Sequence, residues 1–176
     1  CPDNDLDEML LSLSEFSEKS SSFFRPYLGA LVQRLCEIAT NTTVSNSVRN
    51  KSILCLVSIA EGSPEMCQYD ESYYAPVFES LIKISSEIND GSPWEYDTNN
   101  TSPYQTALDS IGVLANVIEL KNIFSHIYQL VVSYLSKDNV TWQIAYASIS
   151  ALSCIDLESI YNREFFEIIS MFLNMD

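Results

Sequence analysis

The sequence predicts an all-α protein, a superhelical solenoid in which about four antiparallel helix pairs stack side by side. An apolar helical pattern, a break and a second apolar helical pattern recur at roughly 40–50 residues, the period of HEAT repeats. Small residues, aliphatics and an acid close the first pattern at 56–61, 115–119 and 152–156, whereas aromatics open the second at 73–78 and 124–128. Only 4 Gly and 6 Pro occur in 176 residues, which is few for a turn-rich β protein. These observations favour an armadillo-like alpha-alpha superhelix.

The first helix pair is expected within residues 3–42. Apolar residues at helical spacing run from Leu6 to Phe16, and the serines at 20–22 then break the pattern. The partner helix is expected to open with Phe24-Arg25-Pro26, because proline is favoured in a first helical turn, where its missing N–H has no partner anyway.

The second pair is expected within residues 44–90. Its first helix begins near Asn46 and stops at Gly62-Ser63-Pro64, and its second helix runs over about 71–89. The expected inward face of that second helix consists of Tyr74, Val77, Phe78, Leu81, Ile82 and Ile88. An irregular stretch follows over 90–102, where Gly, Pro and Asn interrupt the helical pattern.

The third and fourth pairs are expected within residues 102–137 and 139–176. Their four apolar patterns run over Ala107–Ile118, Phe124–Leu135, Trp142–Leu152 and Phe165–Leu173. Short breaks favour antiparallel neighbours, so residues 1–176 are expected to form a single solenoid. The chain opens at Cys1 without Met and ends inside the last expected helix, so we expect a piece of a longer solenoid.

Charge and composition limit the kinds of molecule that the protein is expected to bind. The chain has 24 acids and 9 Lys or Arg, a formal net charge of −15. Phosphate backbones would be repelled, so we expect no direct nucleic-acid binding, whereas basic partners would be attracted. The alternative is that the acidity only keeps the protein dissolved. No apolar stretch approaches the ~18–20 residues that span a bilayer, so membrane insertion is not expected.

No catalytic or metal-binding pattern is present in the sequence. The cysteines form no C-x-x-C pair, and Cys36, Cys55 and Cys154 lie inside apolar helical runs, which indicates buried free thiols. The single histidine, His126, has no second ligand or base nearby in the sequence and is interpreted as structural. There is no P-loop and no G-x-G-x-x-G. We therefore expect no enzyme, no metal and no cofactor.

A set of short motifs in the same order resembles the importin-beta superfamily of nuclear transport receptors, and within it the importin beta-3 type (a karyopherin). The first is Ser22-Phe23-Phe24-Arg25-Pro26-Tyr27-Leu28. The others are Leu31-Val32, residues 38–42, Arg49, residues 54–61, 64–67, 107–109 and 142–147, and Ala151-Leu152. The resemblance covers nearly the whole chain.

The resemblance implies a curved solenoid that carries protein cargo through the nuclear pore and shuttles between cytoplasm and nucleus. It implies binding of Ran-GTP, which releases import cargo, and of FG nucleoporins. In relatives the inter-repeat region that corresponds to 90–102 is strongly acidic, but here it holds only Asp90, Glu95 and Asp97. The alternative function is a HEAT-repeat assembly scaffold or regulatory subunit unrelated to nuclear transport.

Candidate contact residues follow from the architecture, in which the second helix of each pair usually lines the concave face. Acids off the apolar stripe of these helices are candidates for binding a basic cargo signal: Glu37, Glu79, Glu87, Glu164 and Glu167. The alternative is a solvated face. Trp94 and Tyr96 lie on the expected loop and are candidate partner contacts, the alternative being a loop docked on the protein itself.

Overall fold

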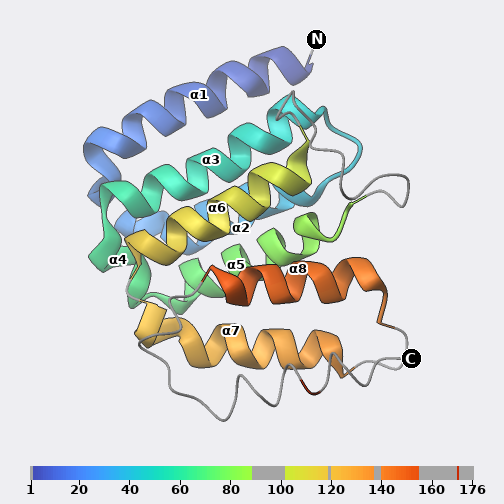
Figure 1. Cartoon of the computed structure of the whole chain (residues 1–176). Coiled ribbons are helices and arrows are strands. Elements are labelled where there is room, and N and C mark those ends of the chain that lie inside the picture. Colours follow the sequence, from blue (N-terminus) through green and yellow to red (C-terminus); the bar gives the residue numbers. More distant parts are fainter. Residues whose placement is uncertain (1, 89–101, 119, 137–139, 155–169, 171–176) are drawn as a thin grey trace.

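The computed structural model describes residues 2–88, 102–118, 120–136, 140–154 and 170 (Figure 1). This part of the chain forms seven long helices, one short helix and one 3₁₀ segment, and it contains no strand. The predicted all-α class is confirmed. Seven of the eight expected helices are found, and the eighth, beginning at Phe165, lies outside the described residues.

The first pair contains an unexpected turn. Helix α1 (Pro2–Ser20) is followed by the 3₁₀ segment η1 (Ser21–Tyr27) and then by α2 (Leu28–Thr40). We expected the second helix to open at Phe24, but the α-helix begins at Leu28. Pro26 lies inside η1 and lacks the N–H that would continue an α-helical hydrogen-bond ladder there. The change of direction therefore takes place in the tighter 3₁₀ geometry.

Helix α3 (Asn46–Gly62) begins with a side-chain cap. Ser45 Oγ accepts the backbone N–H of Val48 at 3.4 Å, which satisfies one of the free donors of the first turn. The predicted break after Gly62 is present, but an unpredicted short helix, α4 (Pro64–Gln68), follows it. Pro64 suits the first helical position because its ring fixes a helical φ.

Helix α5 (Glu71–Ser85) is capped by Asp70, whose carboxylate accepts the N–H of Ser72 at 2.9 Å. It ends four residues before the predicted limit of 89, with Ser86 as its C-cap. The remaining helices are α6 (Pro103–Val117), α7 (Leu120–Leu135) and α8 (Trp142–Ser153). Their places agree with the apolar patterns of the third pair and of the first half of the fourth.

The helices are arranged in two rows (Figure 1). In the first row α1 packs on α3 and α3 packs on α6, and in the second row α2 packs on α5. Helix α5 also contacts α6, α7 and α8, and α8 packs on α7. Each pair thus covers the apolar stripe of its neighbour, which is the translation expected of a solenoid. The individual repeat boundaries remain predictions.

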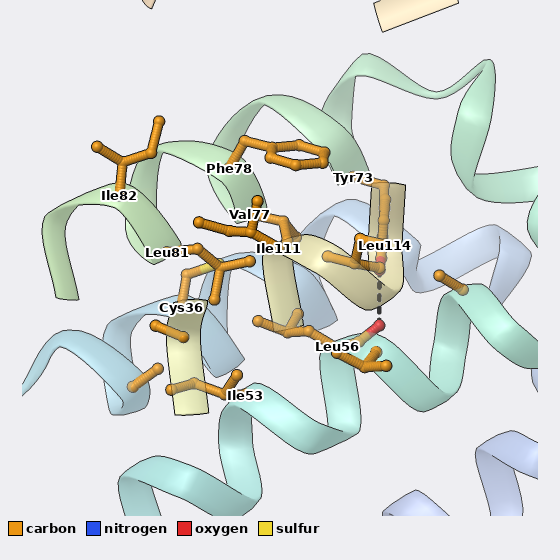
Figure 2. Close-up of a cluster of buried hydrophobic side chains, with 14 of the residues drawn as sticks. Cys36, Ile53, Leu56, Tyr73, Val77, Phe78, Leu81, Ile82, Ile111 and Leu114 are labelled. Carbon is orange, nitrogen blue, oxygen red and sulfur yellow. Dashed lines mark hydrogen bonds between the residues drawn. The ribbon is translucent and has the colours of Figure 1, made fainter. Parts of the chain in front are cut away.

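The core centres on α5 (Figure 2). Its Val77 and Leu81 point toward α3 and α6, where Leu56 and Ile111 are buried, and Phe78 is buried as well. Removing such a side chain from water contributes on the order of 1.5–3 kcal/mol.

The sequence analysis chose the wrong tyrosine as the inward-facing residue at the start of α5. Tyr73, rather than Tyr74, is fully buried, and Tyr74 is half-buried. The Tyr73 hydroxyl donates to Leu56 O over 2.6 Å (Figure 2). Burial raises the pKa of Tyr73 well above its usual value, so it stays a neutral donor. Its hydrogen bond offsets the cost of burying a phenol.

The described helices include none that is both long and apolar enough to cross a membrane. Within the same residues, no group of three or more His, Cys, Asp or Glu side chains is placed to hold a metal ion.

Candidate functional site

A groove between α2 and α5 is the candidate binding site. Its volume is about 230 Å³. The two helices run parallel and approach closely at Gly29, where a Cβ atom would lie 3.1 Å from Ser72 Oγ. The groove is lined by Gln33, Cys36, Glu37 and Thr40 of α2 and by Pro76, Glu79, Ser80 and Lys83 of α5. It therefore lies between the second helices of two neighbouring pairs, where the sequence placed its acidic candidates.

Cys36 lies at the bottom of the groove. Its side chain is buried, and the thiol donates to Pro76 O with an Sγ–O distance of 3.5 Å. Burial raises the pKa of Cys36, a hydrogen bond with Ser80 opposes the shift, and the charges of Glu79 and Glu37 add to it. The thiol is therefore protonated at neutral pH and is a packing group rather than a nucleophile.

Glu37 lies on the α2 wall and is held by its own helix. Arg34 Nη1 is 3.0 Å from Glu37 Oε2, and Gln33 Nε2 donates to Glu37 Oε1 over 3.3 Å. Both charged side chains are more than half exposed, so the ion pair contributes little to stability. A cation from a ligand would meet a carboxylate that already has two donors.

Glu79 and Lys83 form the α5 wall, one helical turn apart. Both are exposed, and neither forms an ion pair with any described residue. Glu79 also lies close to α7, because its charge adds to the burial that raises the pKa of Tyr134. The carboxylate of Glu79 thus lies within electrostatic reach of both α2 and α7, with no described cation paired to it.

Glu87 differs from the other two described acidic candidates because it is part of the framework. Both of its carboxylate oxygens accept from Arg49 Nη2, at 2.7 and 2.8 Å. Arg49 is only 4 % exposed, and its Nε donates to Ala39 O over 2.7 Å. This arrangement ties α3 to the end of α2 and to the chain just after α5. Reversing the charge of Glu87 would therefore disturb the packing of α3 as well as the surface.

The structure brings two of the seven candidate contact residues together. Glu37 and Glu79 line one groove, whereas Glu87 does not line it. Glu164, Glu167, Trp94 and Tyr96 lie outside the described residues, and their proposed roles remain predictions.

Sequence reasoning missed the cations of this site, Arg34 and Lys83. The spacing carried a signal for both, because Arg34 precedes Glu37 by three residues and Lys83 follows Glu79 by four. What the spacing could not show is that α2 and α5 stand side by side, so that Glu37 and Lys83 line the same groove.

The cysteines and the histidine offer no second site. The described free cysteines are Cys36, Cys55, Cys67 and Cys154, the first three buried. Burial raises the pKa of Cys55 and of Cys67 to about 12, so neither is a reactive thiolate. The ring of His126 packs edge-on against Tyr74 with centroids 5.4 Å apart, a contact between α7 and α5.

Comparison with known proteins supports the fold. No protein-family model matches the sequence. The chain is similar in structure to Kap121p bound to RanGTP, with a TM-score of 0.83 and 18% identity over 96% of this chain and 18% of that one. Kap121p bound to Pho4p gives 0.83 at 18% identity, over 96% of this chain and 17% of that chain.

A third structure is that of the karyopherin Kap121p bound to the SUMO protease Ulp1p. It gives a TM-score of 0.84 at 17% identity, over 97% of this chain and 17% of that chain. The chain thus spans about a sixth of the length of the karyopherin that it resembles. It has the helical-solenoid fold of a karyopherin segment, and the partners in these structures are those of Kap121p.

Proposed function

We propose that this chain is part of a nuclear transport receptor of the importin-beta superfamily, of the importin beta-3 type, and that it binds basic segments of protein cargo. The observation that carries the proposal is the groove that Glu37 and Glu79 line from neighbouring second helices. The likeness to structures of Kap121p with protein partners supports it. By the same resemblance, the whole protein would bind Ran-GTP and FG nucleoporins and shuttle through the nuclear pore.

The chemistry of the groove suits reversible binding and not catalysis. A ligand ammonium or guanidinium would pair with Glu79, and the polar groups of Ser80 and Thr40 are at hand for an extended backbone. Exposed charge pairs contribute about 0.2–1 kcal/mol each, so tight binding would need several such contacts along the solenoid. The net charge of −15 would speed the approach of a basic segment at low salt.

A helical-repeat assembly scaffold is the second candidate. The observation in its favour is the corner between α1 and α2, where Phe23 and Tyr27 are 63% and 65% exposed. Exposed aromatic side chains are typical of protein contacts. A scaffold that binds through this corner would not respond to charge changes in the groove.

The test is binding of a labelled peptide in which Lys residues are separated by three small polar residues, measured by fluorescence anisotropy. Glu37→Lys/Glu79→Lys should weaken binding about tenfold at about 50 mM salt, and the effect should shrink as screening grows. The matched control is Glu15→Lys/Glu18→Lys, which makes the same change in net charge on two exposed residues of α1. Equal loss in both variants would mean that only net charge matters and would contradict the groove.

A further inference from the structure

The groove is not uniformly acidic. Glu79 and Lys83 lie on the same helix, and a spacing of four residues places them about 6 Å apart along its axis. Both side chains line the groove, and neither is paired with a described residue. The α5 wall therefore offers a ligand one carboxylate and one ammonium group, in that order from the Pro76 end to the Thr40 end.

The opposite wall does not change this balance. The charge of Glu37 is met by Arg34 and Gln33 of its own helix. Counting Glu37 and Glu79 against Arg34 and Lys83, the groove and its rim carry two charges of each sign. The chain as a whole has a net charge of −15. A ligand selected only by opposite charge would therefore find stronger attraction elsewhere on the surface, so the groove needs a ligand with a charge pattern.

An extended peptide can carry such a pattern. Side chains at positions i and i+2 point to the same side of an extended chain and lie about 6.6 Å apart, close to one helical turn. Resting on the proposed function, we propose that Lys83 determines the specificity of this groove. The groove selects an extended peptide with Lys or Arg beside Glu79 and Asp or Glu two residues away, beside Lys83. A second basic residue at that position is rejected.

The test uses three peptides of equal length with Gly and Ser flanks, carrying Lys-Ser-Glu, Glu-Ser-Lys or Lys-Ser-Lys. Both mixed orders are included because the groove fixes where the charges lie and leaves the chain direction open. The wild-type chain should bind one mixed peptide about threefold to tenfold more tightly than Lys-Ser-Lys at low salt, from the exposed charge pair gained and the like-charge contact avoided. Lys83→Glu should invert that preference.

Lys19→Glu is the matched control, because Lys19 is an exposed lysine in the last turn of α1, just as Lys83 is in the last turn of α5. It should leave the preference unchanged. Lys83→Gln, which adds no charge to the end of the helix, should abolish the preference without inverting it. It therefore keeps the test valid if Lys83→Glu folds poorly.

Three results would count against the inference. If Lys83→Gln and Lys83→Glu bind all three peptides with the wild-type order while Glu79→Lys abolishes binding, the inference fails and the proposed function stands. A loss of preference in Lys19→Glu equal to that in Lys83→Glu would also overturn it, since net charge alone would explain the effect. If the wild type binds none of the peptides, including that with widely spaced lysines, the proposed function fails as well.

Discussion

Two of the contacts between the first two helix pairs are alike in arrangement: α1 packs on α3, and α2 runs beside α5. Across the α1–α3 seam, polar groups bond directly: Ser14 Oγ and Ser58 Oγ are 2.9 Å apart, and Cys55 Sγ donates to Leu10 O over 3.0 Å. The backbones come so close at Gly62 that no side chain would fit. These polar groups are bonded between the two helices and are therefore not available to a ligand.

At the α2–α5 groove the two helices also lie side by side, but the described charged side chains do not bond from one helix to the other. The hydrogen bonds of Glu37 stay within α2, and Glu79 and Lys83 bond to no described residue across the groove. Among the described groove residues, Cys36 bonds to the other wall, where its thiol contacts Pro76 O and Ser80. A charged side chain that forms no bond to a neighbouring helix is therefore a candidate for contact with a partner. An acid that already bonds to another helix has a structural role.

The largest expected effect separates two acids of the same helix region. Glu87→Lys should lower the free energy of unfolding by about 3 kcal/mol, because the buried guanidinium of Arg49 would lose its carboxylate and face a second cation. Glu79→Lys should change it by less than about 0.5 kcal/mol. Urea denaturation followed by circular dichroism measures both. If the two variants were equally stable, Glu87 would have no structural role that Glu79 lacks.

The next effect compares the two close helix approaches. A Cβ at Gly62 would lie 2.5 Å from the backbone oxygen of Ser17, so Gly62→Ala should cost about 2 kcal/mol as α1 and α3 separate. At Gly29 the nearest atom is the side-chain Oγ of Ser72, at 3.1 Å, which can shift. Gly29→Ala should therefore cost under about 1 kcal/mol.

Gly112→Ala is the control for helix propensity in this series. Its Cβ would lie 3.9 Å from Cys154 Sγ, an ordinary contact, so alanine should be neutral or stabilise α6 by up to about 1 kcal/mol. Thermal or urea melts of the three variants should rank them in that order. A Gly62→Ala protein as stable as Gly112→Ala would show that the α1–α3 seam is looser than described.

A smaller effect tests whether a charge that bonds across the α1–α3 seam contributes to stability. Lys51 and, to a lesser extent, Ser47 hold the pKa of Asp7 below its ordinary value. A carboxyl whose pKa is lower in the folded state stabilises the fold above its unfolded pKa, about 3.9, and loses that contribution as the pH falls through the folded pKa. The difference in stability between wild type and Asp7→Asn should therefore be constant between about pH 5 and 7 and shrink below about pH 4.

Asp5→Asn provides the comparison, since it removes an exposed carboxylate from the same helix without touching Lys51. If both variants follow the same pH dependence, the effect reflects net charge and not the ion pair across the seam.

The last prediction involves no change in stability. Cys36 lines the groove and is 6% exposed, whereas Cys55 in the α1–α3 seam is 0% exposed. Alkylation of the native protein at about pH 8.5, read by mass spectrometry of peptides, should modify Cys36 faster than Cys55. A bound basic peptide should slow the reaction of Cys36 and leave that of Cys154 unchanged. Faster reaction of Cys55 would mean that the seam opens more readily than the groove.

The sequence by itself determined the class of fold and the places of seven helices. Apolar periodicity, Pro64 and the break near Gly62 act over a few residues, and such local information is fully present in the chain. The acidic candidates Glu37 and Glu79 could be chosen in the same way, because they lie off the apolar stripe. The pattern did not predict η1 or α4, since segments of seven and five residues are too short to show a helical periodicity.

Only the tertiary structure decided which charges are bonded and which face an open groove. Glu79 and Glu87 look alike in the sequence, yet Glu87 meets a buried arginine 38 residues earlier in the chain, and Glu79 faces α2. Likewise, Tyr73 and Tyr74 are adjacent residues of the same type, and only the tertiary structure decides that Tyr73 bonds to the carbonyl of Leu56. The physical reason is register: how far one helix slides along another is set by the packing of the whole stack, as at Gly29 and Gly62, and no local pattern encodes it.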